Sequence, residues 1–309
     1  LKLVGEAGKV LRKEKAVAFD ASLNPVAPNP FIRHMYTADP SAHVWADGRL
    51  YVYASHDIAP PRGCDLMDRY HVFSTDDMVH WTDHGEILNS SQVPWGRKEG
   101  GFMWAPDCAY KNGTYYFYFP HPSETNWDNS WKIGVATSCR PAEGFEVKGY
   151  IEGMDPLIDP CVFVDDNGQA YIYNGGGGIC KGGKLKDNMM ELDGLMQPME
   201  GLEDFHEATW VHKYNGKYYM LSSGCTGWDP NIAEIAVADS IMGTWKTIGN
   251  PCTGPDADKT FYAQSTYVQP VVGKKNAYIA MFDRWKKKDL EDSRYVWLPV
   301  LVKDGKITI

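Results

Sequence analysis

A turn glycine followed by an aromatic-rich strand recurs along this chain and restricts its fold more than any other feature. The pattern reads "DGRLYVYASHD" at Gly48, "KNGTYYFYFP" at Gly113, "DNGQAYIYNG" at Gly168 and "YNGKYYMLSSG" at Gly216, with a weaker copy near Asn276. Because Asn-Gly and Asp-Gly supply the positive φ angles that tight two-residue turns need, each copy predicts a hairpin. The copies are 48 to 65 residues apart, which indicates a structural repeat.

A second hairpin pattern follows several of these copies. It comprises a short strand, a polar turn and another short strand, as in "HVFSTDDMVHWTDHG" (71–85), "IGVATSCRPAEGFEV" (133–147) and "IAEIAVADSIMGTWKTIG" (232–249). Two hairpins per repeat predict an all-β protein, a five-bladed β-propeller of four-stranded antiparallel blades over residues 31–309. The alternative is a β-sandwich of unrelated hairpins, which does not account for five units of similar length. Residues 1–30 have mixed charge and proline and are predicted to form an N-terminal strap.

Composition excludes several classes of function. The net charge is −9 and the Lys and Arg residues are scattered, which argues against nucleic acid as a partner. No run of 18 apolar residues occurs, so we expect a soluble protein with no membrane partner, and a monomer. The seven cysteines are dispersed without a CxxC pair, so the sequence predicts neither a disulfide framework nor a zinc site.

Polar residues stand just before the first strand of each predicted blade. They are Asp39, Asp107, Asp159, Glu207 and Gln264. Since the first strand of a blade lines the central channel, we expect these side chains to gather at one mouth of that channel. Pro40 and Pro160 follow two of the acids, and a residue before proline is pushed toward extended backbone. The sequence therefore predicts Asp39 and Asp159 in extended conformation at strand entrances.

Three converging carboxylates without a metal-ligand pattern favour hydrolysis by paired acids. In glycoside hydrolysis, one carboxylic acid protonates the leaving oxygen while a carboxylate activates water or attacks the sugar. A third carboxylate nearby raises the pKa of the proton donor by like-charge repulsion. The net charge of −9 also favours a neutral substrate over a phosphate backbone.

At these positions the chain resembles glycoside hydrolase family 43, a group of five-bladed propeller enzymes. The motifs are "ADPS" (38–41), "WAPD" (104–107), "IDPCVFVDDNG" (158–168) and "HEATW" (206–210). The resemblance implies Asp39 as the general base that activates water, Glu207 as the general acid, and Asp159 as the residue that tunes and orients Glu207. It also implies inversion at the anomeric carbon, with the acid and the base about 6.5 to 9.5 Å apart.

The chain departs from the family pattern at two places. Many members have a glycine and a proline after the acid, whereas Ala208, Thr209 and Trp210 stand here. A histidine that some members use near the axis to hold a cation has no obvious equivalent, and "AQST" (263–266) occupies that region. We therefore expect a metal-independent enzyme that requires no cofactor, with a structural cation at the axis possible but supported by no motif.

The resemblance also suggests a substrate class. The ending "FYAQSTYVQPV" with "SRYVWLPV" is similar to the branch that contains exo-β-1,3-galactanases and side-chain-removing furanosidases. An exo-acting α-L-arabinofuranosidase on plant polysaccharide or oligosaccharide is the leading interpretation; a β-xylosidase, an exo-β-1,3-galactanase and a non-catalytic sugar-binding propeller are the alternatives. We expect a secreted or periplasmic bacterial protein whose signal peptide is not part of this chain.

Four further residues are predicted to bind the sugar. Trp104 and Trp228 would stack on sugar faces, because aromatic rings supply the apolar walls of such pockets. Gln264 and Arg284 would hydrogen-bond hydroxyl groups. The alternatives are a core position between blades for each tryptophan and a surface ion pair between Arg284 and Asp283.

Overall fold

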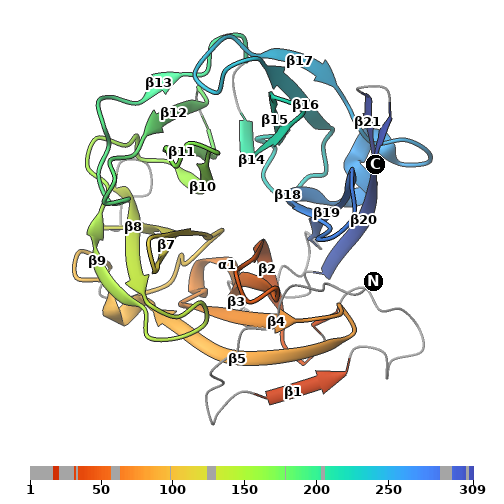
Figure 1. Ribbon diagram of the computed structural model, residues 1–309. Coiled ribbons are helices and arrows are strands. Elements are labelled where there is room, and N and C mark those ends of the chain that lie inside the picture. Colours follow the sequence, from red (N-terminus) through yellow and green to blue (C-terminus); the bar gives the residue numbers. More distant parts are fainter. Residues whose placement is uncertain are drawn as a thin grey trace.

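The chain folds into five antiparallel sheets arranged around a central axis (Figure 1). The computed structural model describes residues 17–20, 31–32, 34–56, 63–97, 99–123, 130–177, 179–202, 206–285, 294–303 and 306–309. The prediction of a five-bladed β-propeller is confirmed. Four sheets have four strands each, and the first has five.

Each blade is built from strands that are consecutive in the chain. Blade 1 contains β2 (Thr37–Val44), β3 (Leu50–His56), β4 (Arg69–Thr75) and β5 (His80–Asn89), with β1 (Val17–Asp20) beside β5. Blade 2 contains β6 (Asp107–Lys111), β7 (Thr114–Pro122), β8 (Trp131–Ser138) and β9 (Glu146–Tyr150). Blade 3 contains β10 (Ile158–Val164), β11 (Ala170–Gly175), β12 (Lys181–Lys184) and β13 (Gln197–Pro198).

The last two blades follow the same plan. Blade 4 contains β14 (His206–Tyr214), β15 (Lys217–Gly224), β16 (Ala233–Ala238) and β17 (Lys246–Gly249). Blade 5 contains β18 (Gln264–Pro270), β19 (Ala277–Arg284), β20 (Arg294–Lys303) and β21 (Lys306–Thr308). The short helices are α1 (Gly63–Leu66), η2 (Ser90–Gln92) and η3 (Ala257–Tyr262).

The predicted turns connect the first two strands of their blades. Asn112 and Gly113 have φ angles of 50° and 85°, and Asn215 and Gly216 have φ angles of 48° and 74°. Positive φ at both central residues is the requirement of the tight hairpin turn whose twist matches its strands. The hairpin prediction from Asn-Gly is thus confirmed at both positions.

The innermost strands β2, β6, β10, β14 and β18 close the ring. Each contacts the innermost strand of both neighbouring blades, and β18 of the last blade contacts β2 of the first. The hydrophobic core lies between the faces of adjacent blades. One cluster, for example, joins Tyr51 and Tyr53 of blade 1 to Phe117 and Phe119 of blade 2. The aromatic strands predicted from the repeat thus supply the packing between blades.

The N-terminal segment is described in part. Residues 17–20 form β1, which pairs antiparallel with β5 on the outer edge of blade 1. The remainder of the predicted strap at 1–30 lies outside the described residues. In the described part of the chain, no helix has both the length and the apolar composition needed to cross a membrane.

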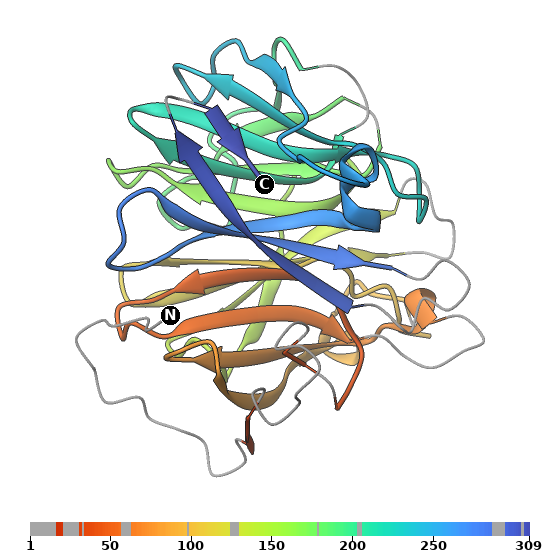
Figure 2. The same ribbon diagram turned by 90° about the vertical axis from the view of Figure 1, so that its right-hand side faces the viewer.

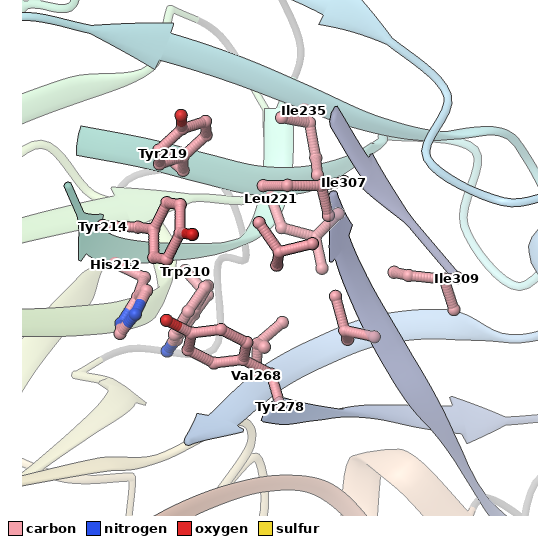
Figure 3. A pocket seen from close by; sticks show the side chains of 12 residues that line it. Trp210, His212, Tyr214, Tyr219, Leu221, Ile235, Val268, Tyr278, Ile307 and Ile309 are labelled. Atoms are coloured by element: carbon pink, nitrogen blue, oxygen red, sulfur yellow. The ribbon is translucent and has the colours of Figure 1, made fainter. Parts of the chain in front are cut away.

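The innermost strands begin at one end of the channel, which we call the acidic mouth. In Figure 2 the short helices α1, in orange, and η3, in blue, both lie toward this side of the disc. A pocket of about 440 Å³ lies between blades 4 and 5 and is lined mainly by aromatic and aliphatic side chains (Figure 3). It is an apolar gap between two blades, and burial lowers the pKa of its one histidine, His212, to about 4.

Candidate active site

An irregularity near the start of the innermost strand recurs in four blades. The pairing register shifts between Ala38 and Ser41, Ile158 and Cys161, Glu207 and Trp210, and Ser265 and Tyr267. Each shift is a β-bulge, in which the inner strand contains one more residue than its partner and re-aims the local side chains. The bulges lie where the sequence places its candidate acids.

The bulges place three residues in left-handed backbone. The φ angles are 50° for Asp39, 53° for Asp159 and 49° for Ala208. The prediction of extended backbone at the two aspartates is therefore wrong. Aspartate tolerates left-handed backbone better than most residues, and the inserted residue needs that conformation, so the bulge overrides the preference set by the following proline.

A pocket of about 410 Å³ opens at the acidic mouth and receives residues from all five blades. Its polar lining includes Asp39, Asp107, Asp159, Thr209 and Gln264. Four of these are among the five residues predicted from sequence to gather here. The fifth, Glu207, is joined to the pocket wall by a hydrogen bond in which Gln264 Nε2 donates to Glu207 Oε1 at 2.7 Å.

Asp159 and Glu207 interact across the boundary between blades 3 and 4. The Asp159 Oδ2 atom accepts a hydrogen bond from the Ala208 N–H at 3.0 Å, which fixes the bulge directly after Glu207. Burial and, second, the charge of Asp159 raise the pKa of Glu207 to about 7. Burial also raises the pKa of Asp159 to about 6. Desolvation thus exceeds the like-charge repulsion from which the sequence argument started.

Blade 5 supports Glu207 through Gln264. The same Nε2 atom also donates to Ser223 Oγ at 2.6 Å, and Ser223 Oγ is 3.5 Å from the Glu207 carbonyl oxygen. Both hydrogens of the amide nitrogen are therefore committed to protein acceptors, so only the carbonyl oxygen of Gln264 can meet a sugar hydroxyl. Cys225, to which the sequence analysis gave no role in the site, also hydrogen-bonds to Glu207, and this bond lowers the pKa of that carboxyl.

Asp283, on β19 of blade 5, supports Asp39 of blade 1. It is fully buried, and its Oδ2 atom accepts a hydrogen bond from the Asp39 N–H at 2.8 Å. In the β18–β19 ladder Asp283 lies directly opposite Gln264. One strand pair therefore contacts both Asp39 and Glu207. A surface ion pair of Asp283 with Arg284 is excluded by this burial.

The sequence comparisons agree with this geometry. Residues 27–279 match the model of the family described as Glycosyl hydrolases family 43.

The chain belongs to glycosyl hydrolases family 43.

Similar curated proteins carry related names. A xylosidase/arabinosidase 43A of Humicola insolens is 37% identical, and the match covers 63% of this chain and 74% of that protein. A β-xylosidase of Xylanibacter ruminicola is 31% identical, with 77% of this chain and 81% of that protein covered. The family 43 assignment makes this chain a glycoside hydrolase.

Solved structures of family 43 proteins have the same fold. A GH43 β-1,3-galactosidase with galactodeoxynojirimycin superposes with a TM-score of 0.78 at 26% identity, covering 89% of this chain and 94% of that one. A GH43 β-xylosidase/α-arabinofuranosidase from a compost microbial metagenome, in complex with xylotriose, gives a TM-score of 0.76 at 28% identity, covering 91% and 96%.

The two tryptophans predicted to bind sugar lie in different surroundings in this family 43 protein. Trp104 is half-buried, and its Nε1 atom donates to the Cys64 carbonyl oxygen at 2.7 Å while its ring packs 5.1 Å from Trp131. Trp228 is exposed and lines a second pocket of about 270 Å³ beside Gln264. The Trp104 ring is therefore held in an aromatic cluster, whereas the Trp228 side chain is open to solvent.

Arg284 lies at the edge of the same region. Its side chain is exposed, and its Nη2 atom donates to the Phe261 carbonyl oxygen at 2.7 Å. The structure thus shows Arg284 supporting the backbone that precedes β18. A contact between Arg284 and a sugar hydroxyl stays a prediction.

Close to the axis, His43 of β2 contacts residues of blades 2 and 5. Its Nε2 atom is 2.8 Å from Asp107 Oδ1, and its Nδ1 atom is 3.1 Å from the Tyr267 hydroxyl oxygen. Both ring nitrogens are engaged by protein groups, so His43 does not fit the role of a cation ligand. Among the residues that the structure describes, no group of three or more His, Cys, Asp or Glu side chains is arranged to hold a metal ion.

The environment of Glu207 predicts a pH dependence for catalysis. A general acid must be protonated, and a pKa of about 7 keeps Glu207 protonated below that pH, so kcat/KM should fall as pH rises above about 7. Asp159→Asn removes a neighbouring negative charge, which lowers the pKa of Glu207 and moves this falling limb to lower pH. The pH profile of kcat/KM measures the position of this falling limb in the wild type and in the variant, and circular dichroism across the same pH range excludes unfolding. An unchanged alkaline limb in Asp159→Asn would contradict the assignment of Glu207 as the acid.

Loss of Asp283 is predicted to impair positioning of Asp39. Asp283→Ala removes the acceptor that holds the Asp39 N–H, so the left-handed backbone relaxes; misplacement of a reacting group by about 1 Å lowers turnover about 10²-fold. Asp283→Asn retains an acceptor oxygen and should retain more activity. Measured kcat and KM for both variants, with thermal unfolding as the control, test this. Equal activity in both variants would mean that the contact does not position the base.

Proposed function

We propose that this family 43 glycoside hydrolase is an exo-acting, inverting enzyme that removes α-L-arabinofuranosyl side chains from plant polysaccharides. The observation that carries the proposal is the convergence of Asp39, Asp159 and Glu207 from three blades at one mouth, with a raised pKa on Glu207. The names of the xylosidase/arabinosidase relatives support the substrate class.

In the proposed reaction Glu207 and Asp39 have opposite tasks. Glu207 donates its proton to the glycosidic oxygen as the bond to the anomeric carbon breaks, while Asp39 takes a proton from a water that attacks the opposite face of the sugar. Burial and, second, the charge of the neighbouring Asp159 keep the Glu207 carboxyl protonated near neutral pH. The proposal requires neither metal nor cofactor, and it includes a secreted or periplasmic location because its polymeric substrate lies outside the cell.

Two other sugars have specific support. The β-xylosidase of Xylanibacter ruminicola covers more of this chain than the xylosidase/arabinosidase 43A does. The β-1,3-galactosidase structure has a TM-score of 0.78. β-Xylosides and β-1,3-galactan are therefore the second candidates.

Reporter glycosides distinguish these candidates. The enzyme is incubated with aryl α-L-arabinofuranoside, β-D-xyloside and β-D-galactoside, and the product anomers are followed by NMR. The proposal expects the arabinofuranoside to be cleaved fastest, with inversion. Cleavage with retention would contradict the roles of Asp39 and Glu207, and a chain that binds sugar but cleaves none of the reporters would be a non-catalytic propeller.

A further inference from the structure

Asp107 lines the pocket at the acidic mouth, yet the proposed reaction gives it no task. It is 2% exposed, and three donors surround its carboxylate. The Cys108 N–H and His43 Nε2 each lie 2.8 Å from Oδ1, and the Val162 N–H donates to Oδ2 at 2.7 Å. A carboxylate has roughly four acceptor sites, so the protein occupies most of them and leaves little for a sugar hydroxyl or a water.

The bond to Val162 reaches into blade 3, close behind Asp159. The bulge that contains Asp159 ends where regular pairing of β10 with β11 resumes, one residue before Val162. Asp159 has a φ angle of 53°, a conformation that persists only where surrounding contacts impose it. Asp107 of blade 2 therefore holds the strand just beyond the bulge, while the Asp159 carboxyl itself holds the Ala208 N–H of blade 4.

Asp107 is in turn held by blades 1 and 5. His43 of β2 bridges Asp107 Oδ1, at 2.8 Å, and the Tyr267 hydroxyl oxygen of β18, at 3.1 Å. We call Asp107, His43 and Tyr267 the axial network. It joins the innermost strands of blades 1, 2, 3 and 5 by hydrogen bonds. It reaches blade 4 through Trp210, whose ring packs edge-on against the Tyr267 ring with centroids 5.4 Å apart.

The axial network bears on the proton affinity of Glu207 through Asp159. Burial and, second, the charge of Asp159 raise the pKa of Glu207 to about 7, whereas the hydrogen bond from Cys225 lowers it. The separation of the two carboxyls depends on the position of the β10 bulge, and Asp107 fixes the strand beside that bulge. A loosened bulge would let Asp159 move away from Glu207 and would admit water. Both changes lower the pKa of Glu207.

We propose that Asp107 is a positioning residue, which holds the entrance of β10 so that Asp159 stays against Glu207. His43 and Tyr267 orient Asp107 for this task. This inference rests on the proposed function, since it takes Glu207 as the proton donor. Asp107 itself contacts neither the sugar nor the attacking water, so its loss should lower kcat far more than it raises KM.

Substitutions at Asp107 test this role through the pH profile. Asp107→Ala is expected to lower kcat about 10- to 10²-fold with KM little changed, because misplacement of a catalytic group lowers turnover. It should also move the falling alkaline limb of kcat/KM to lower pH. Asp107→Asn keeps one acceptor oxygen, so its kcat and its alkaline limb should lie between those of the wild type and those of Asp107→Ala.

A double-mutant cycle shows whether Asp107 acts through Asp159. Asp159→Asn removes the charge that Asp107 keeps in place, so adding Asp107→Ala should shift the alkaline limb no further. The matched control is Asp165→Ala, which deletes a carboxylate, 8% exposed, that joins blade 3 to Lys213 and Tyr218 of blade 4 beyond the other end of β10. It should lower the thermal unfolding temperature and leave the alkaline limb in place.

Tyr267→Phe removes only one hydroxyl from the axial network and keeps the ring. It should move the alkaline limb in the same direction as Asp107→Ala, by less, and it carries the test if Asp107→Ala fails to fold. Tyr51→Phe is its control, because it also removes the hydroxyl of a fully buried tyrosine, here bonded to Asp47 Oδ2 at 2.7 Å. It should leave the limb unchanged.

The outcomes separate the positioning role from the function itself. An alkaline limb that stays in place in Asp107→Ala and Tyr267→Phe would overturn the positioning role and leave the glycosidase assignment intact. A loss of about 10³-fold in Asp107→Asn with an unmoved limb would overturn it too, by making Asp107 a catalytic group. Titration of the Glu207 carboxyl by ¹³C NMR, assigned by its absence in Glu207→Gln, measures the same shift without substrate. It therefore tests the axial network even if the wild type cleaves no reporter and the proposed function is refuted.

Discussion

Glu207→Gln is expected to lower kcat/KM about 10²- to 10⁴-fold on substrates with poor leaving groups, because the amide cannot protonate the glycosidic oxygen. The size of the loss should depend on the leaving group. Dinitrophenolate departs without protonation, so cleavage of a dinitrophenyl glycoside should fall far less than cleavage of an oligosaccharide. Rates of the wild type and of Glu207→Gln, measured on a series of substrates whose leaving groups differ in pKa, therefore test whether Glu207 is the acid.

The matched control for this variant is Glu152→Gln, which makes the same chemical change at an exposed turn. It should leave the rates on every substrate unchanged. A Glu207→Gln variant that loses the same factor on all leaving groups would show that this carboxyl does not act as the proton donor.

Asp39→Asn should lower kcat by about 10³-fold or more on every substrate, including the dinitrophenyl glycoside. Activation of water is needed whatever group departs, so the loss should not vary with the leaving group. Asparagine also tolerates left-handed backbone, and the backbone N–H that donates to Asp283 remains, so the geometry of the strand entrance should survive.

Asp187→Asn serves as the control for the base, since Asp187 is an exposed carboxylate paired with Lys111 on blade 2. Turnover close to that of the wild type in Asp39→Asn would mean that another group activates the water. A loss that depends on the leaving group in Glu207→Gln, together with a loss that does not depend on it in Asp39→Asn, would fix which acid serves which oxygen.

The repeat made the architecture predictable. Asn-Gly turns dictate their own backbone, and aromatic residues on alternating strands need a face to pack against, so both signals are local and survive without knowledge of the rest of the chain. The same periodicity predicted that Asp39, Asp107, Asp159 and Gln264 would gather at one mouth, which the pocket confirms.

The conformation and partners of these residues were less predictable, since they depend on contacts between blades. The proline rule for Asp39 and Asp159 considers only neighbours in sequence, and the bulges that override it arise from pairing with β3 and β11. The sequence left open a surface ion pair between Asp283 and Arg284, because the burial of Asp283 against blade 1 follows only from closure of the ring. Residues 260–262 form a left-handed run before β18 that no glycine signals.

The pairing of Gln264 with Asp283 in blade 5 also ties activity to closure of the ring. Blades 1 to 4 contain Asp39, Asp159 and Glu207, but blade 5 contributes the amide that holds Glu207 and the carboxyl that holds the Asp39 backbone. The active site is therefore a property of the whole ring, and no partial set of repeats contains all of its supporting contacts.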